Sequence, residues 1–291
     1  MVVETDNYGY RHSTATLCGV GDTRLFRQSW SVPIPRALLV VVHGLGEHSA
    51  RYGPLVRALR GHRISVASLD LRGHGRSEGK RGHVDRFDDY VADLGSLLDT
   101  VRAENSGCRT FVLGHSLGGV IAARYALDHP GDLSGLILSS PGFAARVRVP
   151  PYKAWFGRVC SWLVPRLTLR TGIEVEALTH DPEVRAAYRA DPLIHGVAST
   201  RWYTEFLAAG RRCLAEAPRL ELPLLAFHGD ADSVVSSAGT ELFVKRASST
   251  DKTMTLFPGL YHETMNETES ERASVLDHVV TWLDRRVNGG D

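Results

Sequence analysis

The sequence predicts an α/β fold in which helices cover both faces of a mostly parallel central sheet. Strand-like and helix-like segments alternate along most of the chain, as is typical of a doubly wound sheet. The runs at 38–42 and 224–227 are apolar throughout, as parallel strands buried on both faces require. The alternation stops after Pro141 and resumes near Leu220, with mostly helical, aromatic-containing sequence in between. We expect a core in two segments with an inserted helical cap: core 1–140, cap 141–220 and core 221–291.

The individual elements follow from short apolar runs and from the longer helix-like segments between them. Strands are expected, in chain order, at 14–20, 23–29, 37–42, 64–69, 110–113, 135–138, 222–227 and 253–257. Core helices are expected near 52–59, 87–102, 117–128, 237–247 and 270–287. The sequence has no internal repeats and no low-complexity tracts.

The amino-acid composition excludes several kinds of protein. Of the 291 residues, 43% are hydrophobic and 23% are charged, which is ordinary for a globular protein with a sizeable core. The net charge of +1 gives no reason to expect a nucleic-acid partner. The first residues lack the apolar segment of a signal peptide, and the apolar run at 37–42 is too short to span a bilayer, so we expect a soluble, cytoplasmic protein. Four separated cysteines without a C-x-x-C pair indicate free thiols in a reducing compartment: Cys18, Cys108, Cys160 and Cys213.

The most informative motif is Gly114-His115-Ser116-Leu117-Gly118. An apolar, strand-like run at 111–113 precedes it, and the segment at 119–127 reads as the start of a helix. A G-x-S-x-G sequence at a strand-to-helix turn is a nucleophile elbow, which exposes its serine at the end of the sheet. The following helix points the positive end of its dipole at the same place. Ser116 is therefore the predicted nucleophile.

A serine nucleophile needs a base within hydrogen-bond distance and a carboxylate that orients the base. In chains with this elbow the order is serine, then the acid, then histidine. The segment after the strand at 222–227 offers two acids, of which Asp232 is favoured because it lies far enough along the loop to turn back across the strand ends. Asp230 is the alternative, and a turn or capping role is expected for it. His262 follows the last strand and is the predicted base.

Two backbone N–H groups are expected to bind the oxyanion of the reaction. One belongs to Leu117, the residue after the nucleophile, and the other to Leu45, in the loop after the strand at 37–42. Backbone amides suit this role because they are in place before the charge develops. The histidines are not clustered at ligand spacing with cysteines or acids, so no metal site is predicted.

Taken together, these motifs resemble the monoacylglycerol lipase branch of the α/β-hydrolases, which is also described as lysophospholipase-like or serine aminopeptidase-like. The resemblance extends from about Asp22 to Leu283 and rests on six segments in the order of the family: 43–52, 70–77, 114–118, 191–193, 228–232 and 259–262. It implies the α/β-hydrolase fold and the same triad and oxyanion donors. It further implies that three residues line a polar pocket for the glycerol leaving group: Glu47, Arg51 and Tyr188. For Glu47 and Arg51 the alternative is a simple ion pair near a helix start.

The activity that the resemblance implies is hydrolysis of monoacylglycerols to glycerol and fatty acid through an acyl-enzyme, without metal or organic cofactor. A lysophospholipase or a broad-specificity carboxylesterase is the alternative, because both use the same residues with a different headgroup pocket. A non-catalytic lipid-binding protein on a hydrolase fold is a more distant alternative, against which the intact triad argues.

The cap carries a signal of its own between Asp132 and Glu174, because no acidic residue falls there. Basic residues and apolar residues at helical spacing share this window: Arg146, Arg148, Tyr152, Lys153, Trp155, Phe156, Arg158, Val159, Trp162, Leu163, Arg166 and Arg170. One interpretation is an amphipathic helix that packs on the core. The other is a surface that contacts a membrane or micelle, with apolar residues inserted and basic residues near anionic headgroups.

Overall fold

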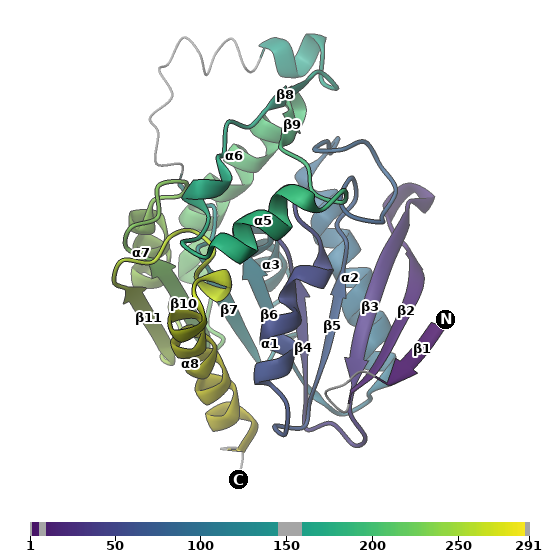
Figure 1. The fold of residues 1–291 in the computed structure, drawn as a ribbon, viewed down its shortest axis with the longest axis vertical. Helices are drawn as coiled ribbons and strands as arrows, with labels where there is room; N and C mark the ends of the chain where they lie inside the picture. The colour runs from purple at the N-terminus through teal and green to yellow at the C-terminus, as the bar shows by residue number, and fades with distance from the viewer. Residues whose placement is uncertain (1, 6–9, 145–158, 289–291) are drawn as a thin grey trace.

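A nine-stranded sheet forms the centre of the computed structural model, which describes residues 2–5, 10–144 and 159–288 (Figure 1). The strands of this sheet are β1 (Val2–Thr5), β2 (Arg11–Cys18), β3 (Arg24–Ser31), β4 (Ala37–Val42), β5 (Ile64–Leu69), β6 (Arg109–His115), β7 (Gly135–Ser139), β10 (Leu224–Gly229) and β11 (Lys252–Phe257). Their order across the sheet is β1-β2-β3-β5-β4-β6-β7-β10-β11. Antiparallel pairing joins β1, β2, β3 and β5, and parallel pairing joins the strands from β5 to β11.

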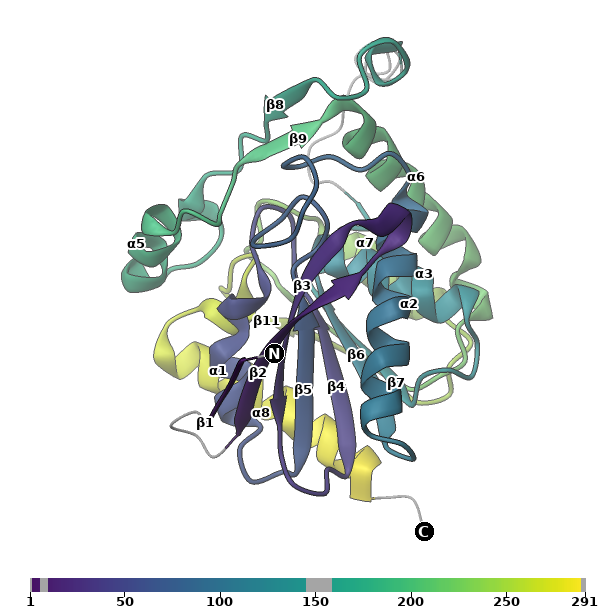
Figure 2. The same ribbon diagram turned by 90° about the vertical axis from the view of Figure 1, so that its right-hand side faces the viewer.

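The parallel strands occupy the buried middle of the sheet. Every residue of β4, β5, β7 and β10 is buried, which explains why these strands read as unbroken apolar or small-residue runs in the sequence. One face of the sheet packs against α1 (Gly53–Ala58) and α8 (Glu269–Asn288). The other face packs against α2 (Phe87–Glu104), α3 (Leu117–Asp128) and α7 (Ser237–Arg246), so the core has two hydrophobic layers (Figures 1 and 2). The predicted α/β fold with helices on both faces is confirmed.

The helices of the core are α1 (Gly53–Ala58), α2 (Phe87–Glu104), α3 (Leu117–Asp128), α7 (Ser237–Arg246) and α8 (Glu269–Asn288). Short 3-10 helices lie at Val20–Asp22, Ser49–Tyr52, Val175–Ala177, Ala217–Arg219 and Thr264–Asn266. Each strand and core helix expected from the sequence is present, and its ends differ from the expected ones by three residues or fewer. Among the described residues, every helix is too short or too polar to cross a bilayer.

The described part of the segment between β7 and β10 lies above the carboxyl ends of the parallel strands (Figure 1). Its described part contains α5 (Pro182–Ala190), α6 (Thr200–Glu216) and a two-stranded sheet of β8 (Thr168–Arg170) and β9 (Val197–Ser199). The sequence predicted mostly helix here, and the two strands were not predicted. Strands of three residues are too short to show a period of two, and only their pairing across nearly thirty residues of chain defines them.

Candidate active site

Ser116 occupies the sharp turn between β6 and α3, where its backbone has φ 52° and ψ −112°. A positive φ at a residue with a Cβ costs roughly 1–3 kcal/mol, so the surrounding structure must hold it in place. The flanking glycines make this possible: a Cβ on Gly114 would lie 2.3 Å from the Gly118 carbonyl oxygen, and a Cβ on Gly118 would lie 2.1 Å from that of Val42. The Ser116 N–H also donates to the Ser139 carbonyl over 3.0 Å. The predicted elbow geometry is therefore present.

His262 follows β11 and lies beside the buried carboxylate of Asp232. Its Nδ1 is 2.7 Å from Asp232 Oδ2. The other carboxylate oxygen accepts hydrogen bonds from the backbone N–H groups of Val234 and Val235, at 2.7 and 3.0 Å. Asp230 has a different partner, because its side chain accepts from the Gly259 N–H at 2.6 Å. Of the two candidate acids, the structure brings Asp232 to the histidine and places Asp230 in a turn.

A second histidine shares this carboxylate. His228 Nε2 lies 2.8 Å from Asp232 Oδ2, and its Nδ1 lies 3.0 Å from the Thr240 hydroxyl. No role was predicted for His228, although it lies four residues before Asp232 in the sequence, near the end of β10. Two imidazole donors on one oxygen and two amides on the other hold the Asp232 side chain in a single orientation.

Electrostatics favour a charged acid and a basic histidine at this site. Burial would raise the pKa of Asp232, but His262, His228 and the backbone donors hold that pKa well below its usual range. Burial would lower the pKa of His262, yet Asp232 overcomes this effect, with smaller contributions from Glu263 and Glu47, and the pKa lies above its ordinary value. The neighbouring His115 behaves oppositely, because burial and the nearby His262 lower its pKa to about 4.

The two predicted oxyanion donors lie at the same end of the sheet as Ser116. Leu45 is in the loop after β4, and Leu117 is the first residue of α3. Within the described ranges, neither of these two N–H groups has an acceptor in the protein. The N–H of Gly44, in contrast, donates to Glu47 Oε1 over 2.5 Å. Two unoccupied donors next to the nucleophile suit a negatively charged oxygen.

A buried charge cluster, which we call the Arg51 cluster, consists of Glu47, Arg51 and Glu263. Arg51 Nη1 donates to Glu47 over 2.9 Å, and Nη1 and Nη2 donate to the two oxygens of Glu263 over 2.7 and 2.6 Å. The guanidinium lies 5.0 Å from the ring centre of Tyr188, on α5. The Glu47–Arg51 pair that the sequence left as an alternative is thus present. Its extension by Glu263 joins residues 212 positions apart, and one sequence alone gives no signal for it.

The cavity beside Ser116 has a volume of about 40 Å³ and is lined by core and cap residues. The core contributes Ser116, His262, Leu45, His115 and both acids of the Arg51 cluster, Glu47 and Glu263. The segment above the sheet contributes Thr171, Ile173, Leu178, Tyr188, His195 and Gly196. All the predicted site residues except Arg51, Leu117 and Asp232 therefore face one cavity. Each of these three neighbours a lining residue: Arg51 pairs with Glu47, Asp232 binds His262, and Leu117 follows Ser116.

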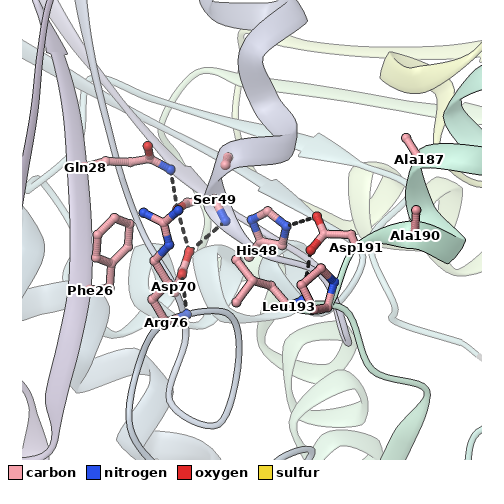
Figure 3. A pocket seen from close by; sticks show the side chains of 12 residues that line it. Phe26, Gln28, His48, Ser49, Asp70, Arg76, Ala187, Ala190, Asp191 and Leu193 are labelled. Carbon is pink, nitrogen blue, oxygen red and sulfur yellow. Dashed lines mark hydrogen bonds and ion pairs between the residues drawn. The ribbon is translucent and has the colours of Figure 1, made fainter. Parts of the chain in front are cut away.

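A larger hollow of about 430 Å³ lies outside this cavity, between β3, the start of the Ser49–Tyr52 turn and α5 (Figure 3). Its polar side chains are paired with one another. His48 Nε2 lies 2.8 Å from Asp191, and Asp70 accepts from Ser49 over 2.5 Å. We interpret this hollow as part of the contact region between α5 and the core.

One group of side chains has the composition of a metal site: ligand atoms of His180, Glu267 and Glu271 lie within 4.8 Å of one another. Both oxygens of Glu267 are already occupied, because one accepts from the Tyr261 N–H over 2.7 Å and the other from Thr179 and from the His180 N–H. Glu267 therefore anchors the segment around His180 to the turn after His262, and we assign no metal to it.

Comparison with known proteins shows the family to which the chain is similar. The family model described as serine aminopeptidase, S33 (Hydrolase_4) matches residues 33–269. The monoacylglycerol lipase of Mycolicibacterium smegmatis is 35% identical over 93% of this chain and 96% of its own length, and the human monoglyceride lipase is 34% identical over 90% and 87%.

Comparison with solved structures shows the same similarity. The crystal structure of the Paleococcus ferrophilus monoacylglycerol lipase superimposes with a TM-score of 0.83 at 32% identity, covering 90% of this chain and 99% of that one. The chain belongs to the serine aminopeptidase S33 family, as a carboxylic ester hydrolase of the α/β-hydrolase fold that is similar to monoacylglycerol lipases.

Proposed function

We propose that this hydrolase cleaves monoacylglycerols to glycerol and a free fatty acid. The observation that carries the proposal is the cavity in which Ser116, the Asp232-bound His262 and the polar Arg51 cluster meet. The relatives named monoacylglycerol or monoglyceride lipase support this choice of substrate.

In the proposed mechanism, Ser116 attacks the ester carbonyl while His262 accepts the hydroxyl proton. The tetrahedral oxyanion is bound by the N–H groups of Leu45 and Leu117, whose orientation is set before the reaction starts. His262 then donates its proton to the glycerol oxygen. The glycerol departs, and the acyl group remains on Ser116. Water activated by His262 attacks this acyl-enzyme and releases the fatty acid. Asp232 keeps the imidazole oriented and stabilises its charged form throughout.

The Arg51 cluster and Tyr188 are proposed to bind the glycerol. Glu47 and Glu263 face the cavity as acceptors for hydroxyl groups, and the Tyr188 hydroxyl belongs to the same lining. Burial, together with the two nearby acids, raises the pKa of Tyr188 to about 12, so its hydroxyl remains a donor at neutral pH. Two carboxylates and a phenol are suited to an alcohol with several hydroxyl groups.

We also propose that the segment 141–220 acts as a cap that contacts the lipid surface from which substrate is drawn. Its described part exposes large apolar side chains that do not face the core, with 77% of Trp162, 61% of Leu163 and 58% of Leu169 accessible. Arg166 lies close by in the chain and is also exposed. Exposed apolar residues near basic ones are typical of peripheral membrane contact. Seven residues of the predicted surface lie outside the described residues: Arg146, Arg148, Tyr152, Lys153, Trp155, Phe156 and Arg158.

The proposed substrate is tested by hydrolysis of mono-, di- and triacylglycerols with the same acyl chain, with Ser116→Ala as the inactive control. We expect kcat/KM to be highest for the monoacylglycerol, because the cavity is covered by the cap and offers polar groups suited to a small alcohol. Triacylglycerol turnover at a comparable rate would contradict the proposal and indicate a lipase of broader range.

A further inference from the structure

The wall of the cavity that contains Glu47 and Glu263 has an unusual charge pattern. Glu47 and Glu263 both contribute to the lining, and no lysine or arginine among the described residues does so. Arg51 is not part of this lining and pairs with both acids, at 2.9 Å from Glu47 and 2.6 Å from Glu263. The charged residues of the Arg51 cluster that line the cavity are therefore its two acids.

The formal charge of this wall is negative. Two carboxylates and one guanidinium sum to −1. Burial would raise the pKa of Glu47, but Arg51 overcomes this effect and lowers that pKa to about 2, so this acid is ionised at neutral pH. The two other histidines of the cavity provide no compensating charge, because burial lowers the pKa of both His115 and His195 to about 4. His262 must itself be neutral when it accepts the proton of Ser116.

Glu263 accepts hydrogen bonds from the two Arg51 nitrogens that would otherwise be free to bind a phosphate. A guanidinium binds phosphate or carboxylate through two parallel N–H donors. In this structure those donors, on Nη1 and Nη2, are directed at the two oxygens of Glu263 over 2.7 and 2.6 Å. Without Glu263, Glu47 and Arg51 would form a neutral pair, and the forked face of the arginine would be free for an anionic headgroup.

We propose that Glu263 is the residue that makes this pocket selective for neutral headgroups and excludes those that carry a phosphate. The inference rests on the proposed function and deepens it, since it separates monoacylglycerols from lysophospholipids with an anionic headgroup. Glycerol hydroxyls donate hydrogen bonds to carboxylates, whereas phosphate oxygens only accept them and are repelled by the charge.

A purely structural role of Glu263 makes a different prediction. Glu263 neutralises a buried arginine and also accepts from the Asn266 side-chain amide over 3.1 Å. If that were its whole role, its loss would reduce stability and would slow all substrates by the same factor. The informative quantity is therefore the ratio of kcat/KM for 1-acyl-glycerol 3-phosphate to kcat/KM for the monoacylglycerol with the same acyl chain.

The test measures this ratio in the wild-type protein and in five variants, one of them a control, at a pH on the plateau of every activity profile. Glu263→Gln removes the charge, and Glu263→Ala also empties the guanidinium fork. We expect the ratio to rise at least about tenfold in Glu263→Gln and further in Glu263→Ala, because one unit of charge close to the phosphate is removed. Arg51→Met brings the sum of charges to −2 and should lower the ratio. The double variant Arg51→Met, Glu263→Gln restores the sum to −1, and its ratio should return to within about threefold of the wild-type value.

Glu241→Gln is the matched control, because it removes the same charge from an exposed position on α7. Its ratio should equal that of the wild type. An unchanged ratio in both Glu263 variants, with monoacylglycerol turnover retained, would overturn the inference and leave Glu263 with a structural role. Should these variants fail to fold, the Arg51→Met and double variants decide the question through the same ratio. Failure of the proposed function is distinct, because wild type would then hydrolyse a short soluble ester but not the monoacylglycerol.

Discussion

The two sides of His262 both carry buried carboxylates, but these carboxylates are bound differently. On one side, Asp232 accepts hydrogen bonds from two imidazoles and two backbone amides. On the other side, Glu47 and Glu263 pair with Arg51. Asp232 is the main group that raises the pKa of His262, whereas Arg51 offsets one of the two negative charges of the glutamates. The comparison suggests that one side serves proton transfer and the other serves recognition of the leaving group.

The largest effect is expected when the Asp232 side is changed. Asp232→Asn should lower kcat by roughly three orders of magnitude or more, because the neutral amide cannot stabilise the protonated His262. Steady-state kinetics on a short ester and on a monoacylglycerol should show the same loss. Asp230→Asn is the matched control, and it should retain nearly full activity because Asp230 binds only the Gly259 turn. The reverse result would show that the acid is Asp230.

A smaller and substrate-dependent effect is expected on the Arg51 side. Glu47→Gln should reduce kcat/KM for a monoacylglycerol by about 10- to 100-fold, since a buried acceptor for the substrate hydroxyl is weakened. Hydrolysis of a short ester with a simple alcohol should change only a few-fold, because that alcohol makes no such hydrogen bond. Equal losses on both esters would remove the distinction between the two sides of His262.

The pH profile of kcat/KM should depend on the carboxylates on both sides of His262, because all of them affect its pKa. The pKa of His262 is raised above its ordinary value, mainly by Asp232 and with a contribution from Glu263 and Glu47. Since only the neutral imidazole accepts the Ser116 proton, activity should fall on acidification through this raised pKa. Glu263→Gln removes one of the nearby negative charges, lowers that pKa and should shift the acid limb to lower pH. An acid limb that stays in place would mean that the charge of Glu263 does not reach His262.

Substitutions of exposed residues in the cap are expected to have the smallest effect on the rate of ester hydrolysis. Trp162→Ser combined with Leu169→Ser should weaken sedimentation with anionic lipid vesicles, because indole and leucine side chains supply the apolar part of interfacial binding. Hydrolysis of a short soluble ester should remain unchanged. If the double variant sediments as the wild type does, these residues do not form a lipid contact.

Much of this arrangement was predictable because it depends on local sequence. The buried strand β4, the helix α3 and the elbow at Ser116 each have patterns that one sequence displays. Because parallel strands end at one edge of the sheet, the order of Ser116, Asp232 and His262 was enough to expect them near one another. The role of His228 and the pairing of Glu263 with Arg51 depend on side-chain contacts made only in the folded chain. The pairing of β8 with β9 depends in the same way on tertiary structure.

The backbone of Ser116 has a consequence for the thermal stability of the enzyme. A residue with φ 52° and ψ −112° adopts a conformation that costs glycine little and strains any residue with a Cβ, serine and alanine alike. Ser116→Gly should therefore raise the melting temperature relative to Ser116→Ala, with the gain reduced in part by the greater freedom of glycine in the unfolded chain. Both variants lack the nucleophile, so the comparison isolates the backbone contribution. The enzyme gives up some thermal stability at the one position where its nucleophile must be exposed, an example of the trade-off between stability and activity.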